Sequence, residues 1–218
     1  MRTGVPEIIL AEGKDPEDLA KIVMKALEKS GRAIISRVKS YHAEAIKKII
    51  PSSTSVQINK KARMIVINKE DFVIEKTGGK VGIITAGTSD IPVAEEAKII
   101  AEEMGCEVFT AYDVGVAGIH RLFPSLKEMI ERNVDVLIVV AGREGTLPSV
   151  VAGMVDIPVI GVPTSIGYGL GEKGISALTA MLQACSLGLA VVNIDGGVAA
   201  GAVAALIANR VAKARGTK

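Results

Sequence analysis

From residue 81 onward the chain alternates between short apolar segments and longer helical ones, and this alternation restricts the possible folds more than any other feature. Strands are predicted near residues 81–85, 107–111, 135–140, 158–162 and 189–194. Helices are predicted near residues 91–104, 121–132, 146–155, 174–187 and 198–213. Continuous apolar strands are typical of parallel sheets that are buried on both faces. The alternation therefore predicts an α/β fold with a doubly wound, flavodoxin-like, mostly parallel sheet of five strands.

A smaller α/β unit is predicted ahead of this sheet. In "KDPEDLAKIVMKALEKSG", Asp15 is expected to cap a helix that has Pro16 in its first turn and ends at Gly31. The segments "AIISRV" and "ARMIVIN" are typical of strands, and "HAEAIKKII" between them is typical of a helix. The pair Gly78-Gly79 indicates a linker. We therefore expect two domains, residues 1–77 and 78–218, with the active site in the second.

The apolar content of the chain predicts a homo-oligomer. Hydrophobic residues make up 49% of the sequence, and aromatic residues only 3%. Such a surplus requires cover from a membrane or from another subunit. The most apolar stretch, residues 187–212, is broken by Asn193, Asp195 and several glycines, so no membrane span is expected. The charged start of the chain does not resemble a signal peptide, and we expect a cytoplasmic protein.

Charge and cysteine content argue against several other classes. The 26 basic and 24 acidic residues nearly balance, and the two cysteines, Cys106 and Cys185, form no CxxC pattern. A zinc site or a structural disulfide is therefore not expected, and Cys106 is assigned to packing. Basic residues without interleaved aromatics are typical of solvated surface, so no nucleic-acid partner is expected. Those concentrated early in the chain include Lys47, Lys48, Lys60, Lys61, Arg63 and Lys69.

The ends of the predicted strands hold the candidate binding residues. Ligands of doubly wound sheets bind beyond the carboxyl ends of the strands. After the first strand, Thr88 and Ser89 could hold a phosphate or carboxylate and Asp90 a ribose hydroxyl, although this loop taken alone favours a simple helix N-cap at Ser89 or Asp90. After the second strand come Asp113 and His120; a lone histidine is more commonly structural or at the surface.

The remaining three strand ends are also rich in glycine and in polar side chains. After the third strand, Arg143 has a donor fork that suits phosphate or carboxylate, Glu144 could act as a base or cation ligand, and Gly145 permits close approach. A surface ion pair is the alternative for Arg143 and Glu144. The last two strand ends contribute Thr164, Ser165, Tyr168, Asn193 and Asp195. Five such strand ends together predict a site for an anionic nucleotide.

The strand-end motifs resemble those of the aminoimidazole ribonucleotide carboxylase/mutase superfamily of purine biosynthesis. Its Gly-Ser-x-Ser-Asp loop corresponds to "GTSD" at residues 87–90, and its Ala-Gly-Gly-Ala-Ala-His-Leu-Pro segment to "AGREGTLP" at residues 141–148. The catalytic histidine of that superfamily falls on Thr146, which disfavours the purine reaction. Its Met-Pro pair ahead of the last strand becomes Ala184-Cys185.

A closer resemblance, to the LarB family, covers nearly the whole chain. The motifs that carry it are "RTGVPEIILAEGK", "AGTSDIPVAEEA", "DVGVAGIHRL", "REGTLPSVVAG", "GVPTSIGYG" and "MLQACS" with "VVNIDGG". The chain begins directly at the Arg-x-Gly-x-Pro-Glu motif, so longer members are expected to carry residues before it. The family serves nickel-pincer cofactor biosynthesis for lactate racemase. It carboxylates nicotinic acid adenine dinucleotide with CO2 or bicarbonate and cleaves the phosphoanhydride, giving pyridinium-3,5-biscarboxylic acid mononucleotide and AMP.

This resemblance implies roles for particular residues. A pyridinium carbon is electron-poor and cannot attack CO2 until a nucleophile has added to the ring, and a thiolate both adds and leaves readily. Cys185 is therefore the expected covalent catalyst, and Glu144 the expected base or cation ligand. Mg²⁺ is expected for phosphoanhydride cleavage, with Asp113, Asp195 or Glu144 contributing.

The resemblance to the superfamily also implies a homo-octamer. Two alternatives stay open at this point. One is an aminoimidazole ribonucleotide carboxylase or mutase, and the other is a nucleotide-binding subunit without catalytic activity.

Overall fold

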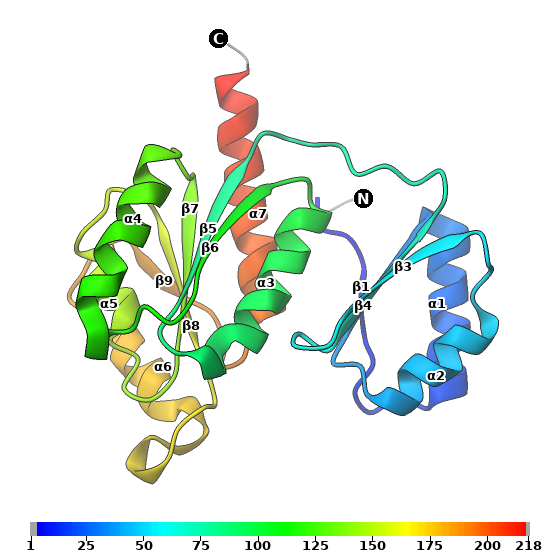
Figure 1. The fold of residues 1–218 in the computed structure, drawn as a ribbon, viewed down its shortest axis with the longest axis horizontal. Coiled ribbons are helices and arrows are strands. Elements are labelled where there is room, and N and C mark those ends of the chain that lie inside the picture. Colours follow the sequence, from blue (N-terminus) through cyan, green and yellow to red (C-terminus); the bar gives the residue numbers. More distant parts are fainter. Residues whose placement is uncertain (1–3, 217–218) are drawn as a thin grey trace. The chain divides into compact units, whose positions relative to one another are not determined.

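The computed structural model describes residues 4–216 and divides the chain between Ile74 and Glu75 into two compact units (Figure 1). The smaller unit contains β1 (Ile8–Leu10), α1 (Pro16–Ser30), β2 (Arg32–Ser36), α2 (Ser40–Ile49), β3 (Thr54–Asn59) and β4 (Met64–Lys69). Its sheet has the order β1-β2-β4-β3, with β1 parallel to β2 and the other pairs antiparallel. As predicted, Asp15 caps α1 by accepting from the amides of Glu17 and Asp18, and Gly31 ends it in the left-handed conformation.

The larger unit holds the expected five-stranded sheet. Its elements are β5 (Lys80–Thr85), α3 (Ile91–Glu103), β6 (Glu107–Ala111), α4 (Leu122–Glu131), β7 (Val136–Ala141), α5 (Leu147–Ala152), β8 (Val159–Pro163), α6 (Ile175–Leu182), β9 (Leu189–Val191) and α7 (Gly197–Arg215). Short 3-10 helices span Thr88–Asp90, Val116–Arg121 and Gly169–Gly174. All strand pairs are parallel, in the order β6-β5-β7-β8-β9. This confirms the flavodoxin-like, doubly wound prediction.

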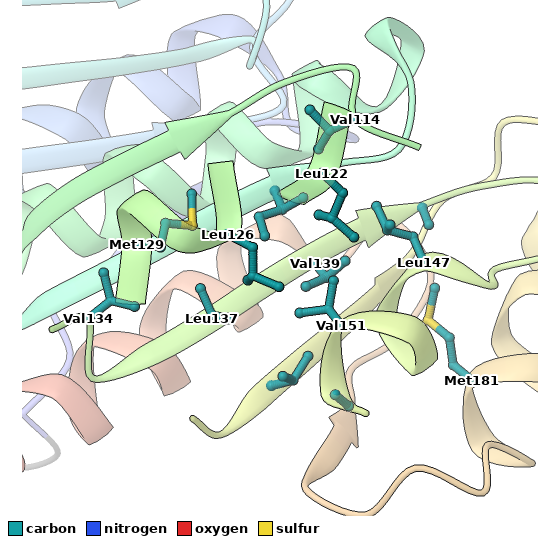
Figure 2. Packing of buried hydrophobic residues seen from close by; sticks show 14 of the residues in the cluster. Val114, Leu122, Leu126, Met129, Val134, Leu137, Val139, Leu147, Val151 and Met181 are labelled. Carbon is teal, nitrogen blue, oxygen red and sulfur yellow. The ribbon is translucent and has the colours of Figure 1, made fainter. Parts of the chain in front are cut away.

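Helices cover both faces of this sheet. On one face α4, α5 and α6 enclose a core that includes Leu126, Val139, Val151 and Met181 (Figure 2). On the other face α7 crosses α3 so closely that a Cβ on Gly201 would lie 2.5 Å from the Ala97 carbonyl oxygen. By length and composition α7 could cross a membrane. Its buried small residues against α3 instead identify it as a core helix of an α/β domain.

Two predicted elements around Cys185 are shorter than the sequence indicated. The helix predicted at 174–187 ends at Leu182, and the strand predicted at 189–194 ends at Val191. The apolar residues Leu182 and Leu187 are 64% and 92% exposed, so they do not extend the buried stripe of α6. Cys185 consequently lies in an exposed connection rather than at the end of a helix.

Several other elements differ from those expected from the sequence. The predicted helix at 146–155 ends at Ala152, before Gly153. Strands β1 and β3 were not predicted, because β1 has three residues and the β3 side chains are largely exposed, so neither presents an apolar run. The division after Ile74 falls three residues before the predicted boundary.

Candidate functional site

The carboxyl ends of the five parallel strands bring five polar loops to one edge of the larger sheet. We refer to residues 86–90, 112–116, 142–146, 164–168 and 192–196 as the carboxyl-edge loops. Two backbone hydrogen bonds link neighbouring strand ends. The Val114 amide donates to the carbonyl of Thr85, the last residue of β5 (3.0 Å), and the Arg143 amide donates to the Ile166 carbonyl (3.0 Å). The site is thus a continuous rim, as expected for a doubly wound sheet.

Asp90 lies beneath this rim and joins three of its loops. Its side chain is buried, with Oδ1 accepting from the Thr164 hydroxyl (2.7 Å) and Oδ2 from the Gly87 amide (2.9 Å). The Gly142 backbone donates a further hydrogen bond to it. Burial raises the pKa of Asp90 above its ordinary value, although these hydrogen bonds oppose that shift. The carboxylate therefore positions the rim; it makes no capping hydrogen bond to α3, and its bond from the Gly87 amide caps the 3-10 helix Thr88–Asp90.

Replacing Asp90 by asparagine is expected to loosen the rim. The amide NH2 would face the Thr164 hydroxyl or the Gly87 amide, both of which act as donors, at a cost of about 1–3 kcal/mol in the free energy of unfolding. A raised native pKa means that the folded chain holds the Asp90 proton more tightly than the unfolded chain. The advantage of wild type over the variant should therefore be largest below the ordinary aspartate pKa of about 4 and decline as pH rises through the native value. Urea unfolding of both proteins across this pH range measures it, and a pH-independent difference would contradict it.

Arg143 and Tyr168 meet at the outer surface of the rim. The Arg143 guanidinium carbon lies 4.2 Å from the centre of the Tyr168 ring, and both residues are exposed. Arg143 has φ = 55°, in the left-handed region that residues other than glycine rarely adopt. Its neighbour Gly142 could not carry a side chain, because a Cβ there would lie 2.6 Å from the Thr164 hydroxyl oxygen. The fixed backbone thus presents an Arg donor fork beside an aromatic face.

Asp113 and Asp195 also have left-handed backbones, and contacts within the protein hold their carboxylates. Asp113 accepts from Arg121 (2.7 Å) in an ion pair that the sequence did not indicate, and its amide donates to the Thr85 hydroxyl (3.0 Å). Asp195 accepts from the Ser165 amide (2.9 Å). The Asn193 side chain accepts from the next backbone amide, that of Ile194 (2.9 Å). These groups shape the loops.

The other predicted binding residues fall into two groups. Thr164 is fully buried, and Gly145, at φ = 65°, faces the Ala177 carbonyl too closely for any side chain. Exposed polar residues on or beside the rim include Thr88, Ser89, His120, Arg143, Glu144, Thr146, Ser165, Tyr168 and Asn193. The exposed chemistry of one chain therefore includes hydroxyl groups, a guanidinium, an imidazole, an amide and a carboxylate.

Cys185 lies away from this rim. It belongs to the connection from α6 to β9, where Gly188 accepts from the amide of Val159, the first residue of β8. The hydroxyl of the adjacent Ser186 is 3.2 Å from that of Ser149 in α5. This connection leads into the amino end of β9, whereas the rim follows the carboxyl ends. Cys185 is therefore not one of the residues of the carboxyl-edge loops.

The second thiol, Cys106, is a packing residue. It is 1% exposed and donates to the Asn209 side-chain oxygen (3.2 Å). Burial raises the pKa of its thiol to about 11. Of the two thiols, Cys185 alone is exposed.

Metal ligands are not gathered at the rim of one chain. Across residues 4–216, no three of His, Cys, Asp and Glu lie together as a metal-binding group. Asp113 and Asp195, expected as Mg²⁺ ligands, are engaged by Arg121 and by the Ser165 amide. The donor set of one chain, over the described residues, does not fit a resident metal ion.

Comparison with known proteins assigns this site to a class. A family profile described as AIR carboxylase matches residues 80–216, which comprise the larger sheet and its loops. N5-carboxyaminoimidazole ribonucleotide mutases of Thermotoga maritima and Pyrococcus horikoshii are each 34% identical, over 108 and 120 residues. These alignments cover 48% and 53% of this chain and 59% and 64% of those enzymes. The larger unit is thus of the AIR carboxylase and mutase class.

The smaller unit narrows the assignment. A profile described as LarB/PurE-like N-terminal domain matches residues 1–70. An uncharacterised protein of Methanocaldococcus jannaschii is 54% identical over 209 residues, which cover 95% of this chain and 80% of that protein. The chain therefore belongs to the LarB family, with an AIR carboxylase-like C-terminal domain.

Proposed function

We propose that this protein carboxylates C5 of the pyridinium ring of nicotinic acid adenine dinucleotide and hydrolyses its phosphoanhydride, giving pyridinium-3,5-biscarboxylic acid mononucleotide and AMP. The observation that carries the proposal is an exposed thiol, Cys185, on an AIR carboxylase scaffold with threonine at position 146. Position 146 therefore lacks a proton-shuttling histidine, and the chain offers a soft nucleophile elsewhere, at Cys185.

The thiolate of Cys185 supplies what the pyridinium ring lacks. It adds to C4, forming an S–C4 bond and moving an electron pair onto the ring nitrogen. C5 of the resulting dihydropyridine is enamine-like and attacks CO2, forming the new C–C bond. Glu144 removes the C5 proton, and the S–C4 bond breaks, which restores the aromatic ring and the thiolate. Water then attacks phosphorus and AMP leaves.

The carboxyl-edge loops hold the anionic parts of the substrate. The Arg143 fork pairs with phosphate oxygens, and the Thr88 and Ser89 hydroxyls donate to phosphate or carboxylate. Asp90 fixes the loops that present these groups. Residues at the carboxyl edge of the sheet therefore both bind the substrate and position the loops that hold it.

The thiol must reach this edge from a second copy of the chain. Cys185 lies beside the exposed Leu182 and Leu187, and the rim carries the exposed Ile166 and Tyr168. Both exposed apolar regions would be buried if one packed against the other in a homo-oligomer. Each site would then receive a thiol from the neighbouring subunit. The family resemblance makes an octamer the expected assembly, which light scattering measures.

Incubation with nicotinic acid adenine dinucleotide, bicarbonate and Mg²⁺ tests the reaction. Mass spectrometry should show the gain of one carboxyl group and the release of AMP. Unchanged substrate with folded, oligomeric protein would remove the proposal. Tight binding of the dinucleotide without turnover would favour a nucleotide-binding subunit.

A second candidate rests on the relatives themselves. Since the mutases that match at 34% identity act on N5-carboxyaminoimidazole ribonucleotide, the same assay should include that substrate. Thr146 argues against this reaction, and we expect no turnover. Conversion of the purine substrate would establish the mutase activity instead.

Exchanging Arg143 for glycine should separate binding from stability. Glycine adopts φ = 55° without steric cost, so the free energy of unfolding should stay within about 1 kcal/mol of wild type despite the lost contact with Tyr168. Loss of the donor fork should weaken dinucleotide binding about tenfold or more. Calorimetric titration and urea unfolding measure the two effects. Unchanged affinity would show that Arg143 does not contact the substrate.

A further inference from the structure

The smaller unit differs in charge from the rest of the chain. Its 74 residues carry 14 Lys and Arg against 9 Asp and Glu, whereas the remaining 144 carry 12 against 15. Several of these cations gather at one place. A hollow of about 310 Å³ opens between α2 and the turn that joins β3 to β4. Most basic residues of this unit are exposed as the sequence predicted, and several of them line one hollow.

Four cationic side chains and no carboxylate line this hollow. They belong to Lys39, which precedes α2, to Lys47 in the last turn of α2, and to Lys60 and Arg63 in the β3–β4 turn. In the described part of the chain, no ion pair engages any of the four. Other lysines and arginines of this unit do find acids, as in Lys21 with Asp18 and Arg37 with Glu12.

The backbone beneath the cations is held in place. Arg63 has φ = 50°, and its carbonyl accepts from the Val38 amide (2.8 Å). The Asn59 side chain accepts from the Ala62 amide (3.0 Å) and fixes the same turn. The floor is apolar, with Val38, Met64 and Ile65 buried. Four cations around an apolar floor repel one another unless an anion lies between them.

We propose that this hollow binds a small phosphate-bearing anion, of the size of a nucleoside monophosphate or the diphosphate of a dinucleotide. Its volume lies at the lower end of the range for small-molecule sites. Its lining includes no aromatic side chain on which the bases of a nucleic acid could stack. The inference does not rest on the proposed carboxylation, because the hollow belongs to the smaller unit alone.

Lysine acylation followed by mass spectrometry locates the site in the full-length protein. With inorganic pyrophosphate in large excess over its Kd, Lys39, Lys47 and Lys60 should react about tenfold more slowly than in chloride of equal ionic strength. Lys21 and Lys25, outside the hollow, should be unaffected. AMP should protect the same lysines and adenosine should not. Absence of protection by both pyrophosphate and AMP would overturn the proposal, as would protection by single-stranded RNA alone.

Paired charge reversals supply the matched control. Lys47→Glu with Lys60→Glu changes two lining residues, whereas Lys48→Glu with Lys61→Glu changes their neighbours on the same elements by the same total charge. The first pair should weaken pyrophosphate binding at this site about tenfold, or about 1.4 kcal/mol, and so reduce the protection of Lys39 at the same pyrophosphate concentration from about tenfold to about twofold. The second pair should have a much smaller effect. Equal effects would indicate general charge attraction and would overturn the proposal.

Discussion

Replacing Cys185 by serine is expected to stop carboxylation of nicotinic acid adenine dinucleotide while leaving the protein folded. An alkoxide from serine is a poor nucleophile toward the ring at neutral pH and a poor leaving group from it, so the rate should fall by about 10³-fold or more. Because the residue is exposed, the free energy of unfolding should change by less than about 0.5 kcal/mol. Carboxylated product measured by mass spectrometry, with urea unfolding of the same samples, tests both statements.

The other thiol of the chain is a suitable control. Cys106→Ser keeps a donor for the Asn209 oxygen but places a more polar group in a buried site, so it should cost about 1 kcal/mol of stability and leave turnover intact. Dinucleotide binding should survive in both variants. Carboxylation by the Cys185→Ser protein at the wild-type rate would show that the thiol is not the covalent catalyst.

The sheet was predictable because its strands are encoded locally. Each of β5, β7 and β8 is a continuous apolar run, and alternation with helices leaves few topologies open. The edges of both sheets carry weaker signals. Strand β3 exposes most of its side chains, so it was not predicted from the sequence. Strand β9 has three residues and was predicted to be longer than it is.

The sequence predicted which loops form the candidate site, but it did not predict which side chains are buried and hydrogen-bonded within the protein. Thr164 and Asp90 are 74 residues apart, and their hydrogen bond exists because β8 and β5 both flank β7. Nothing in "GTSD" shows that its aspartate faces inward. The pairing of Asp113 with Arg121 depends likewise on the turn of the intervening 3-10 helix.

The motif that contains Cys185 spans a whole strand, so its first and last residues lie at opposite ends of that strand. "MLQACSLGLAVVNIDGG" contains the thiol before β9 and Asp195 after it. In a parallel sheet, residues that precede a strand lie at its amino end and residues that follow it lie at the carboxyl end. Cys185 and Asp195 therefore lie at opposite ends of β9, and the shared site that we propose is formed by two chains.

Mixing two inactive proteins should consequently restore activity. Cys185→Ser keeps intact carboxyl-edge loops, and Glu144→Gln keeps an intact thiol, so each alone should fail to carboxylate. When the subunits are dissociated, mixed in equal amounts and reassembled, a site formed by two chains combines an intact rim with the partner's intact thiol in about a quarter of cases. Carboxylation should then return to about a quarter of the wild-type rate per site.

The matched controls for this experiment are reassembled samples of each variant alone, which should stay inactive. A double variant carrying both substitutions, mixed with wild type, measures how far subunits exchange. If mixing gives no activity although exchange is complete, the thiol and the rim act within one chain. That result would require the α6–β9 connection to leave the amino edge of the sheet, and it would refute the two-chain site while leaving the role of the thiol to the Cys185→Ser assay.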